Sequence, residues 1–380
     1  MIARRHQVAL ALTALLAAAA ACQNQARHES ASPGRPAPPV VRDFTLVASG
    51  EVLPHGSVIE RAGFDAGRTG YDFRPMLSGV EPVVRRADLA LCHMDTVYGP
   101  DGAYTDFKAP PQLALGLTTT GYDGCSTASS HVLDDGAPGV RRTLDAMDRA
   151  GLQHAGTART EAEARSVTML QAGPARVAHL SYTYGTDGHP LPAGQPWAVN
   201  LIDADRMISD ARAARMAGAD VVVVSVRWGT EWQEAPDGLQ VALAQRLTAS
   251  TTKGRPDVDL ILGTHAHVPQ AYEKVNGTWV VYGLGDQIAG EIYNRKGVQD
   301  SRGNESTIGR FTFTAPAHPG DRWQVTKAEF LPQMYDLDAG RVLDLGRAIA
   351  GGAELEGVRD RIRDVVLSRG AAADGLVMAE

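Results

Sequence analysis

The chain has 380 residues, of which 44% are hydrophobic and 21% are charged, so it can bury a large core. Its formal net charge of -7 argues against nucleic-acid binding, because nucleic-acid binders usually present a basic face. The 40 glycines and 21 prolines indicate many tight turns and loops.

Residues 1–22 have the pattern of an export signal. Arg4 and Arg5 give a positive start, and the apolar stretch of residues 8–21 is too short to span a bilayer comfortably. Small residues stand directly before Cys22, as in a lipoprotein signal, so we expect Cys22 to be lipidated and to become the mature N-terminus. The expected product is exported and anchored to the outer face of the cell membrane. The alternative is ordinary signal cleavage beside a chance cysteine, which would give a secreted protein.

Three further segments follow the signal. Residues 23–42 are polar and Pro-rich, which predicts an extended tether between the membrane and a folded domain. Residues 43–335 carry the regular patterns of that domain. Residues 336–380 are expected to form a helical extension, with an amphipathic helix over residues 356–367 and a frayed end in the last ten residues.

Short apolar runs rich in β-branched residues predict strands that are covered on both faces. These runs are residues 44–48, 88–91, 177–181, 221–226, 258–262 and 279–282. Amphipathic helical patterns lie between several of them, and residues 310–314 and 323–330 alternate like an antiparallel hairpin. Alternating buried strands and helices indicate a layered α/β domain.

Cys92 and Cys125 lie near the ends of predicted core strands. Two buried free thiols are the expected outcome, because buried cysteines commonly pack as small hydrophobic side chains. Export leaves a disulfide between them as the alternative.

Polar side chains follow several predicted strands at the point where each strand ends. The carboxyl ends of strands in an α/β sheet form the crevice where ligands bind, and carboxylates with imidazoles are what a divalent metal needs. Alone, each could be a helix cap or a solvated loop residue. Their joint placement predicts a shared site. These residues are Glu51, His93, Asp95, Ser130, His131, Arg227, Trp228, Glu231, His265, His267 and Asp286.

The order of the motifs at these positions resembles the CapA family of poly-γ-glutamate capsule synthesis proteins. The motifs are Gly-Glu at 50–51, His-Met-Asp at 93–95, Ser-Ser-His at 129–131, Arg-Trp-Gly-Thr-Glu at 227–231, Gly-Thr-His-Ala-His-Val at 263–268 and Tyr-Gly-Leu-Gly-Asp-Gln at 282–287. The resemblance covers roughly residues 43–335. It implies a layered sandwich of mixed β-sheets flanked by helices, with the architecture of calcineurin-like metallophosphatases.

The resemblance also implies a two-metal centre, from which this chain departs. Arg227 stands where the family has a histidine, and Ser130 and Asp286 stand where it has asparagines. A guanidinium cannot ligate a cation, so we expect the second metal to be weakened or absent and at most one divalent metal ion to bind. The expected ligands are Glu51, Asp95, His265 and His267.

The remaining residues receive their expected roles from the same resemblance. His131 or Glu231 would transfer a proton, and Arg227 would either pair with Asp95 or Glu51 or grip a carboxylate or phosphate of the ligand. These three are the catalytic candidates. The expected substrate-binding residues are His93, Ser130, Trp228 and Asp286.

Three functions fit this pattern. The first is a metal-dependent hydrolase that acts on an anionic envelope polymer or a phosphoester. The second is a non-catalytic protein that binds such a polymer during capsule or wall assembly. The third is a partner in a membrane-bound polymer synthesis or export complex, with a vestigial site.

Overall fold

The computed structural model describes residues 42–67, 69–318 and 321–379. The predicted signal, its Cys22 and all but the last residue of the tether lie outside the described residues. Among the helices that the structure describes, none combines the length and the apolar character that a membrane span requires.

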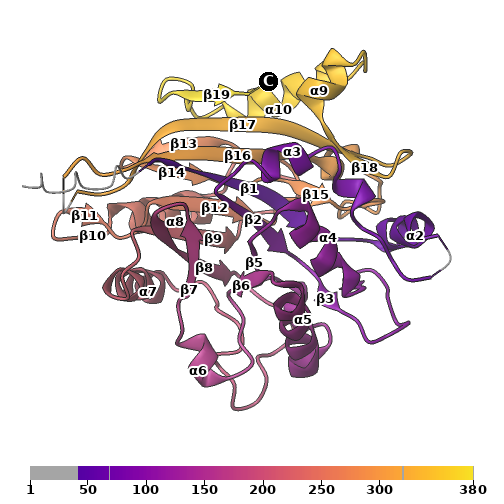
Figure 1. Cartoon of the computed structure of the whole chain (residues 1–380), viewed down its shortest axis with the longest axis horizontal. Coiled ribbons are helices and arrows are strands. Elements are labelled where there is room, and N and C mark those ends of the chain that lie inside the picture. Colours follow the sequence, from indigo (N-terminus) through magenta and orange to yellow (C-terminus); the bar gives the residue numbers. More distant parts are fainter. Residues whose placement is uncertain (1–41, 68, 319–320, 380) are drawn as a thin grey trace, which may run out of the picture. The chain divides into compact units, whose positions relative to one another are not determined.

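The larger of two main sheets has nine strands (Figure 1). Its order is β18-β17-β16-β1-β2-β5-β6, with β15 added beside β1 and β19 beside β17. The strands β1, β2, β5 and β6 are parallel to one another, whereas β16, β17 and β18 run antiparallel. The bounds are β1 (Phe44–Val52), β2 (Leu89–Met94), β5 (Gly124–Ser126), β6 (Gln153–Ala155), β15 (Asp286–Ile288), β16 (Glu305–Thr314), β17 (Gln324–Asp336), β18 (Arg341–Asp344) and β19 (Leu376–Met378).

The second sheet has six strands in the order β13-β14-β12-β9-β8-β7, and its central four are parallel. Their bounds are β7 (Thr168–Ala172), β8 (Ala175–Thr183), β9 (Val221–Arg227), β12 (Leu260–Thr264), β13 (Tyr272–Val275) and β14 (Thr278–Val281). Two small ribbons pair β3 (Val97–Tyr98) with β4 (Lys108–Ala109) and β10 (Thr251–Thr252) with β11 (Arg255–Pro256).

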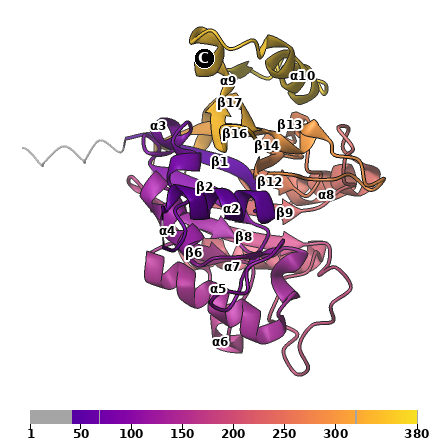
Figure 2. The ribbon, with the colours of Figure 1, turned by 90° about the vertical axis from the view of Figure 1, so that its right-hand side faces the viewer.

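Helices cover the outer faces of both sheets. Four pack on the nine-stranded sheet: α2 (Gly56–Asp65), α3 (Glu81–Val84), α4 (Gln112–Thr120) and α5 (Gly136–Ala150). On the six-stranded sheet lie α7 (Ala204–Met216) and α8 (Gly238–Ala249), and Figure 2 shows α8 on the side away from α4. Short elements complete the set: α6 (Glu161–Ala164), η1 (Pro75–Leu77), η2 (His131–Leu133) and η3 (Ser301–Asn304). The predicted sandwich of mixed sheets flanked by helices is confirmed.

Strand alternation divides each central strand between two cores. In β9, Val221 and Val223 face the core between the sheets, whereas Val222 and Val224 face the core under the helices. In β2, Leu89 and Leu91 likewise face the space between the sheets. Because successive side chains point to opposite faces, the apolar space between the sheets continues toward His93 on β2 and Arg227 on β9.

The cysteines correct one expectation. Cys92 and Cys125 form a disulfide between β2 and β5, rather than two free thiols. The two residues are direct partners in the parallel register, with Cα atoms 4.4 Å apart. Sequence spacing cannot reveal that these strands are neighbours. The next pair along the same register is His93 with Ser126.

The C-terminal segment corrects a second expectation. It contains α9 (Leu345–Ala350) and the predicted final helix, α10 (Glu356–Val366), but it also supplies strands β18 and β19 to the larger sheet. Residues 371–379 are therefore not frayed as expected, because Leu376 pairs with Ala328 and is buried. Figure 1 shows α9, α10 and β19 gathered beside β17.

We predict that the disulfide stabilises the fold by about 2–4 kcal/mol, because it closes a loop of 33 residues in the unfolded chain. The double variant Cys92→Ala, Cys125→Ala should unfold at lower denaturant concentration than the parent chain. A reductant should lower the stability of the parent protein by a similar amount and leave the variant unchanged. Equal unfolding midpoints of the parent chain with and without reductant would contradict the prediction.

Candidate functional site

Buried charged residues meet between the two sheets at the carboxyl ends of their parallel strands. Arg227 ends β9 of the smaller sheet, and Asp95 follows β2 of the larger one. Arg227 donates two hydrogen bonds to the Oδ2 atom of Asp95, from Nη2 at 2.9 Å and from Nε at 3.1 Å. Burial alone would raise the pKa of Asp95. The positive charge of Arg227 outweighs burial and holds this pKa well below the usual range of an aspartate. The pair therefore joins the two sheets as a true ion pair.

Glu51 lies beside this ion pair and is fully buried. Its position depends on Gly50, where an added Cβ would lie 1.8 Å from the carbonyl oxygen of Gly285. This close approach lets the Glu51 N–H donate to that carbonyl at 3.0 Å. Burial, followed by the charge of Asp95, raises the pKa of Glu51 well above its usual value, although Arg227 Nε lies 3.5 Å from Oε1.

His267 lies between two carboxylates on the other side of Glu51. Its Nδ1 is 3.0 Å from Oδ2 of Asp286 and 3.3 Å from Oε2 of Glu51. Burial would lower the pKa of His267, but Asp286, and then Glu51, raise it to about 9. The metal-free site thus favours a proton on His267.

Desolvation outweighs the nearby negative charge of Asp95 at both His93 and His265. Desolvation lowers the pKa of His93 to about 3, and its Nδ1 lies 2.6 Å from Oγ of Ser126. Desolvation, helped by the charge of Arg227, also lowers the pKa of His265. Both rings are therefore neutral at physiological pH. His265 and His267 have positive φ angles of 101° and 60°, a conformation that costs energy in non-glycine residues and often marks a functional site.

The outer part of the site holds His131 and Glu231. His131 stacks on Phe107 with ring centroids 3.8 Å apart, and its Nδ1 lies 3.1 Å from Asp134. Glu231 lies on the loop that leads to α8, where a capping box of Asp237 and Gln240 fixes the helix start. The Asp237 carboxylate also accepts a hydrogen bond from Thr230, which anchors the loop beside Glu231.

Several ligand-type atoms in this cluster are buried and lack a hydrogen-bond partner among the described residues. They are both carboxylate oxygens of Glu51, Oδ1 of Asp95, Nε2 of His93 and Nδ1 of His265. Such atoms are costly to bury, and a cation would satisfy them. Three groups bring their ligand atoms within 4.8 Å of one another: Glu51 with His267 and Asp286, Glu51 with His93 and Asp95, and Glu231 with His265 and His267. The donor types and spacing fit a divalent metal ion.

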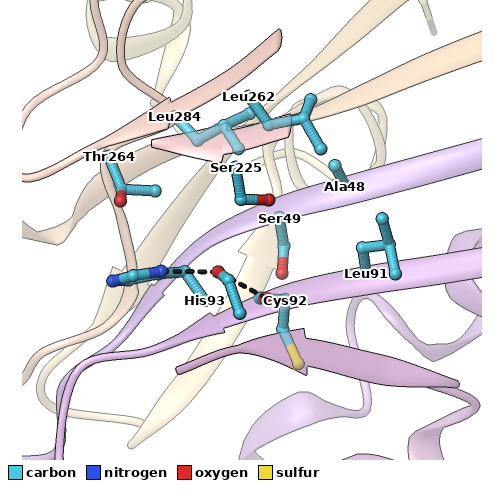
Figure 3. A pocket seen from close by; sticks show the side chains of 10 residues that line it. Ala48, Ser49, Leu91, Cys92, His93, Ser225, Leu262, Thr264 and Leu284 are labelled. Carbon is cyan, nitrogen blue, oxygen red and sulfur yellow. Dashed lines mark hydrogen bonds between the residues drawn. The ribbon is translucent and has the colours of Figure 1, made fainter. Parts of the chain in front are cut away.

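A small cavity lies behind His93, between the sheets (Figure 3). It has room for about one water molecule, and the hydroxyl groups that line it can hold such a molecule through hydrogen bonds. Ser225 and Thr264 come from the smaller sheet, and His93 and Ser126 from the larger one. The Thr264 hydroxyl has no partner among the described residues. Polar side chains of the site therefore continue past His93 into the apolar core between the sheets.

The expectation that Trp228 binds substrate is wrong. Its side chain is fully buried in the core under the helices of the smaller sheet, and its Nε1 donates to the carbonyl oxygen of Tyr282 at 2.8 Å. Because Trp228 follows Arg227 directly, the two side chains point to opposite faces of the sheet. Ser130 is buried just before η2, and no hydrogen bond among the described contacts joins its hydroxyl to Glu51, Asp95 or Arg227.

Three residues that the motifs did not indicate also belong to the site. Tyr184 lies one residue past β8 and covers both the His265 ring, at 4.6 Å, and the Arg227 guanidinium, at 5.7 Å. Its place after a strand is a signal that could have predicted it. Phe107 and Arg295 lie on loops, where no sequence pattern indicates their contacts.

Known proteins resemble this chain in sequence. Residues 45–291, well over half of the chain, match the family described as bacterial capsule synthesis protein PGA_cap. A Mycobacterium tuberculosis protein named probable polyglutamine synthesis accessory protein is 28% identical over 249 residues, which cover 60% of this chain and 62% of that protein. The capsule biosynthesis protein CapA of Bacillus anthracis is 27% identical over 192 residues, covering 50% of this chain and 45% of CapA.

Solved structures give weaker likenesses. A 5'-nucleotidase precursor from Thermus thermophilus is 16% identical with a TM-score of 0.41, and the match covers 84% of this chain and 59% of that one. The NAD nucleotidase of Haemophilus influenzae is 12% identical with a TM-score of 0.42, covering 89% and 64%. These likenesses are too weak to support any statement about activity. The sequence match by itself shows that the chain belongs to the PGA_cap family of bacterial capsule synthesis proteins.

Proposed function

We propose that this protein handles an anionic, carboxylate-rich polymer in capsule or cell-wall biogenesis, with one divalent cation and Arg227 as the positive groups of its site. The single observation that carries the proposal is the place of Arg227. Its guanidinium lies among the buried ligand-type atoms, bonded to Asp95 and 3.5 Å from Glu51. The names of the family and of the CapA relative, which refer to capsule synthesis, suggest the class of polymer.

Charge balance favours one cation rather than two. The cluster holds three buried carboxylates, Glu51, Asp95 and Asp286, against one guanidinium. Metal ligands bind in their deprotonated form, so a bound cation requires an ionised Glu51 and a neutral His267. In that state two negative charges remain, and one divalent cation balances them. A second cation beside Arg227 would meet a repulsion of several kcal/mol at an effective dielectric of about 20.

Glu51, His267 and Asp286 are the residues best placed to hold the cation. The guanidinium of Arg227 lies near Oε1 of Glu51, whereas Oε2 of Glu51 faces His267. A cation held by Glu51 Oε2, His267 and Asp286 would therefore lie on the side away from the guanidinium. A cation there would polarise a carbonyl or phosphoryl group and lower the pKa of a bound water toward about 7.

The other residues bind the ligand and hold protons. Nη1 of Arg227 is buried without a partner among the described residues, so it can donate to a carboxylate or phosphate of the ligand. Asp134 fixes the His131 ring through Nδ1, which leaves Nε2 to hold or accept a proton. The protein would work outside the cell, tethered through Cys22, alone or with a membrane-bound synthesis or export complex.

A second candidate function is a binding protein without catalysis. The two hydrogen bonds from Arg227 to Asp95 favour it, because they engage an oxygen that a two-metal hydrolase would use as a ligand. On this view the histidines and Arg227 form a cleft that binds the polymer.

We predict that the purified protein binds one equivalent of a divalent cation and that His267→Ala removes it, because His267 belongs to two of the three candidate ligand groups. Elemental analysis and calorimetric titration with Mn²⁺ or Zn²⁺ would measure the stoichiometry. The control is His318→Ala, since His318 is exposed on a distant loop. Parent protein that binds poly-γ-glutamate but no metal would support the second candidate and contradict the first.

Replacement of Arg227 by histidine should raise the metal stoichiometry from one to two, because it removes a fixed positive charge and adds a ligand. The same titration would detect this change. Arg310→His provides a matched control, since Arg310 is also ion-paired on a strand, with Glu329, but lies away from the cluster. An Arg227→His protein that folds and still binds one cation would show that Arg227 does not exclude the second.

The raised pKa of His267 predicts a pH dependence of the metal-free protein. Its folded pKa of about 9 lies above the unfolded value of about 6.5, so the protonated form stabilises the fold. This stabilisation, on the order of 3 kcal/mol, is fully present below pH 6.5 and is lost as the pH rises through 9.

NMR titration of the His267 ring and urea unfolding between pH 6.5 and 9.5 would test this expectation. Asp286→Asn should lower the pKa of His267 and flatten the loss of stability, because Asp286 is the main group that raises it. If this variant titrates like the parent protein, Asp286 is not the cause.

A further inference from the structure

Arg295 is an exposed arginine at the outer edge of the site. Its Nε donates to Oε2 of Glu231 at 3.0 Å, and 64% of its side chain is exposed. It lies on the loop between β15 and η3, which is not one of the motifs that define the family resemblance. No role follows for it from those motifs.

The partner of Arg295 places it beside one of the three ligand-type groups. A carboxylate oxygen of Glu231 lies within 4.8 Å of ring nitrogens of His265 and His267. The charge of Arg295 is also close enough to help lower the pKa of His265. Arg295 and Arg227 therefore flank the same histidines, one from solvent and one from the buried side.

The two arginines differ in how firmly they are held. Arg227 is 2% exposed and bonded to a buried carboxylate, so it stays in place. Arg295 makes one exposed ion pair, and such pairs contribute little to stability and are screened by salt. A ligand carboxylate can therefore replace Glu231 as its partner at little cost.

Other charged groups near this edge are already engaged. Arg302 pairs with Glu234 and Asp300, and His189 lies 3.6 Å from Asp134. Neither offers a cation beside His265. Arg295 is the guanidinium that a ligand would meet on the way to Arg227.

We propose that Arg295 binds substrate at the rim of the site, exchanging Glu231 for one carboxylate of a linear polyanion while a neighbouring carboxylate enters the site toward Arg227. The inference rests on the proposed function, because it takes the carboxylate polymer as the ligand. It adds that the site engages the polymer at two points of different depth. Free glutamate carries a positive ammonium group and lacks the repeated carboxylates of the polymer, so it should bind much more weakly.

The test measures binding of poly-γ-glutamate and of free glutamate to the full protein by calorimetry at low salt. Arg295→Gln should weaken polymer binding about five- to tenfold, which is the effect of losing one charged contact, and should leave the metal stoichiometry unchanged. Arg165→Gln is the matched control, because Arg165 is also exposed and paired with a glutamate, Glu161, but directly follows α6, away from the site. It should bind like the parent protein.

Glu231→Gln should have the opposite effect on affinity. It removes the carboxylate that competes for Arg295, so the polymer should bind more tightly. If Arg295→Gln binds the polymer as the parent protein does, or if Arg165→Gln weakens binding equally, the inference is wrong while the proposed function stands. If the parent protein binds neither ligand, the proposed function itself fails. If the protein binds the polymer and Glu231→Gln does not change the affinity, Arg295 does not exchange Glu231 for a carboxylate of the ligand.

Discussion

The ion pair between Arg227 and Asp95 is the interaction on which the site depends. It crosses from the six-stranded to the nine-stranded sheet, and both side chains are buried. Removing both charges from water is costly, and loss of one partner from such a pair typically costs about 3–5 kcal/mol, because the other is left buried and unpaired. The pair therefore ties the relative position of the two sheets to the chemistry at their ends. It also fixes the one positive charge around which Glu51 and the histidines are arranged.

Alternation along the strands separates this chemistry from the cores. Leu91 and His93 point between the sheets, whereas Cys92 points toward the helices, where its disulfide partner Cys125 also lies. The same rule sends Arg227 into the site and Trp228 into the core under α7 and α8. A shift of one residue along a strand would therefore exchange site residues for core residues. The disulfide fixes the register of β2 and β5, the two strands that place His93 beside Ser126.

Much of this arrangement was predictable from the sequence, because buried parallel strands show as apolar runs and their ends show as polar motifs. The sandwich and the meeting of Glu51, Asp95, Arg227, His265 and His267 follow from that pattern. The disulfide does not, since it requires that β2 and β5 be neighbours in register. Strand β19 is too short for its pattern to be told from that of a frayed end. The burial of Trp228 follows from strand alternation past Arg227, which the motif itself does not show. Contacts from loops, such as Phe107 on His131, depend on tertiary folding alone.

With Arg227 in place of a metal ligand, the site holds one positive charge that it can lose, the cation, and one that it cannot, the guanidinium. A bound cation leaves when its ligands are protonated or when the metal is scarce, and His267 holds its proton up to a pKa of about 9. The Arg227 guanidinium stays charged at every physiological pH. Arg227 therefore keeps one positive charge in the site at any metal supply, whereas any chemistry that needs a cation depends on the pH and on the supply of metal. Under the proposed function, binding and catalysis, which share both positive ions in a two-metal site, would depend on different groups: ligand binding on Arg227 together with the cation, and catalysis on the cation.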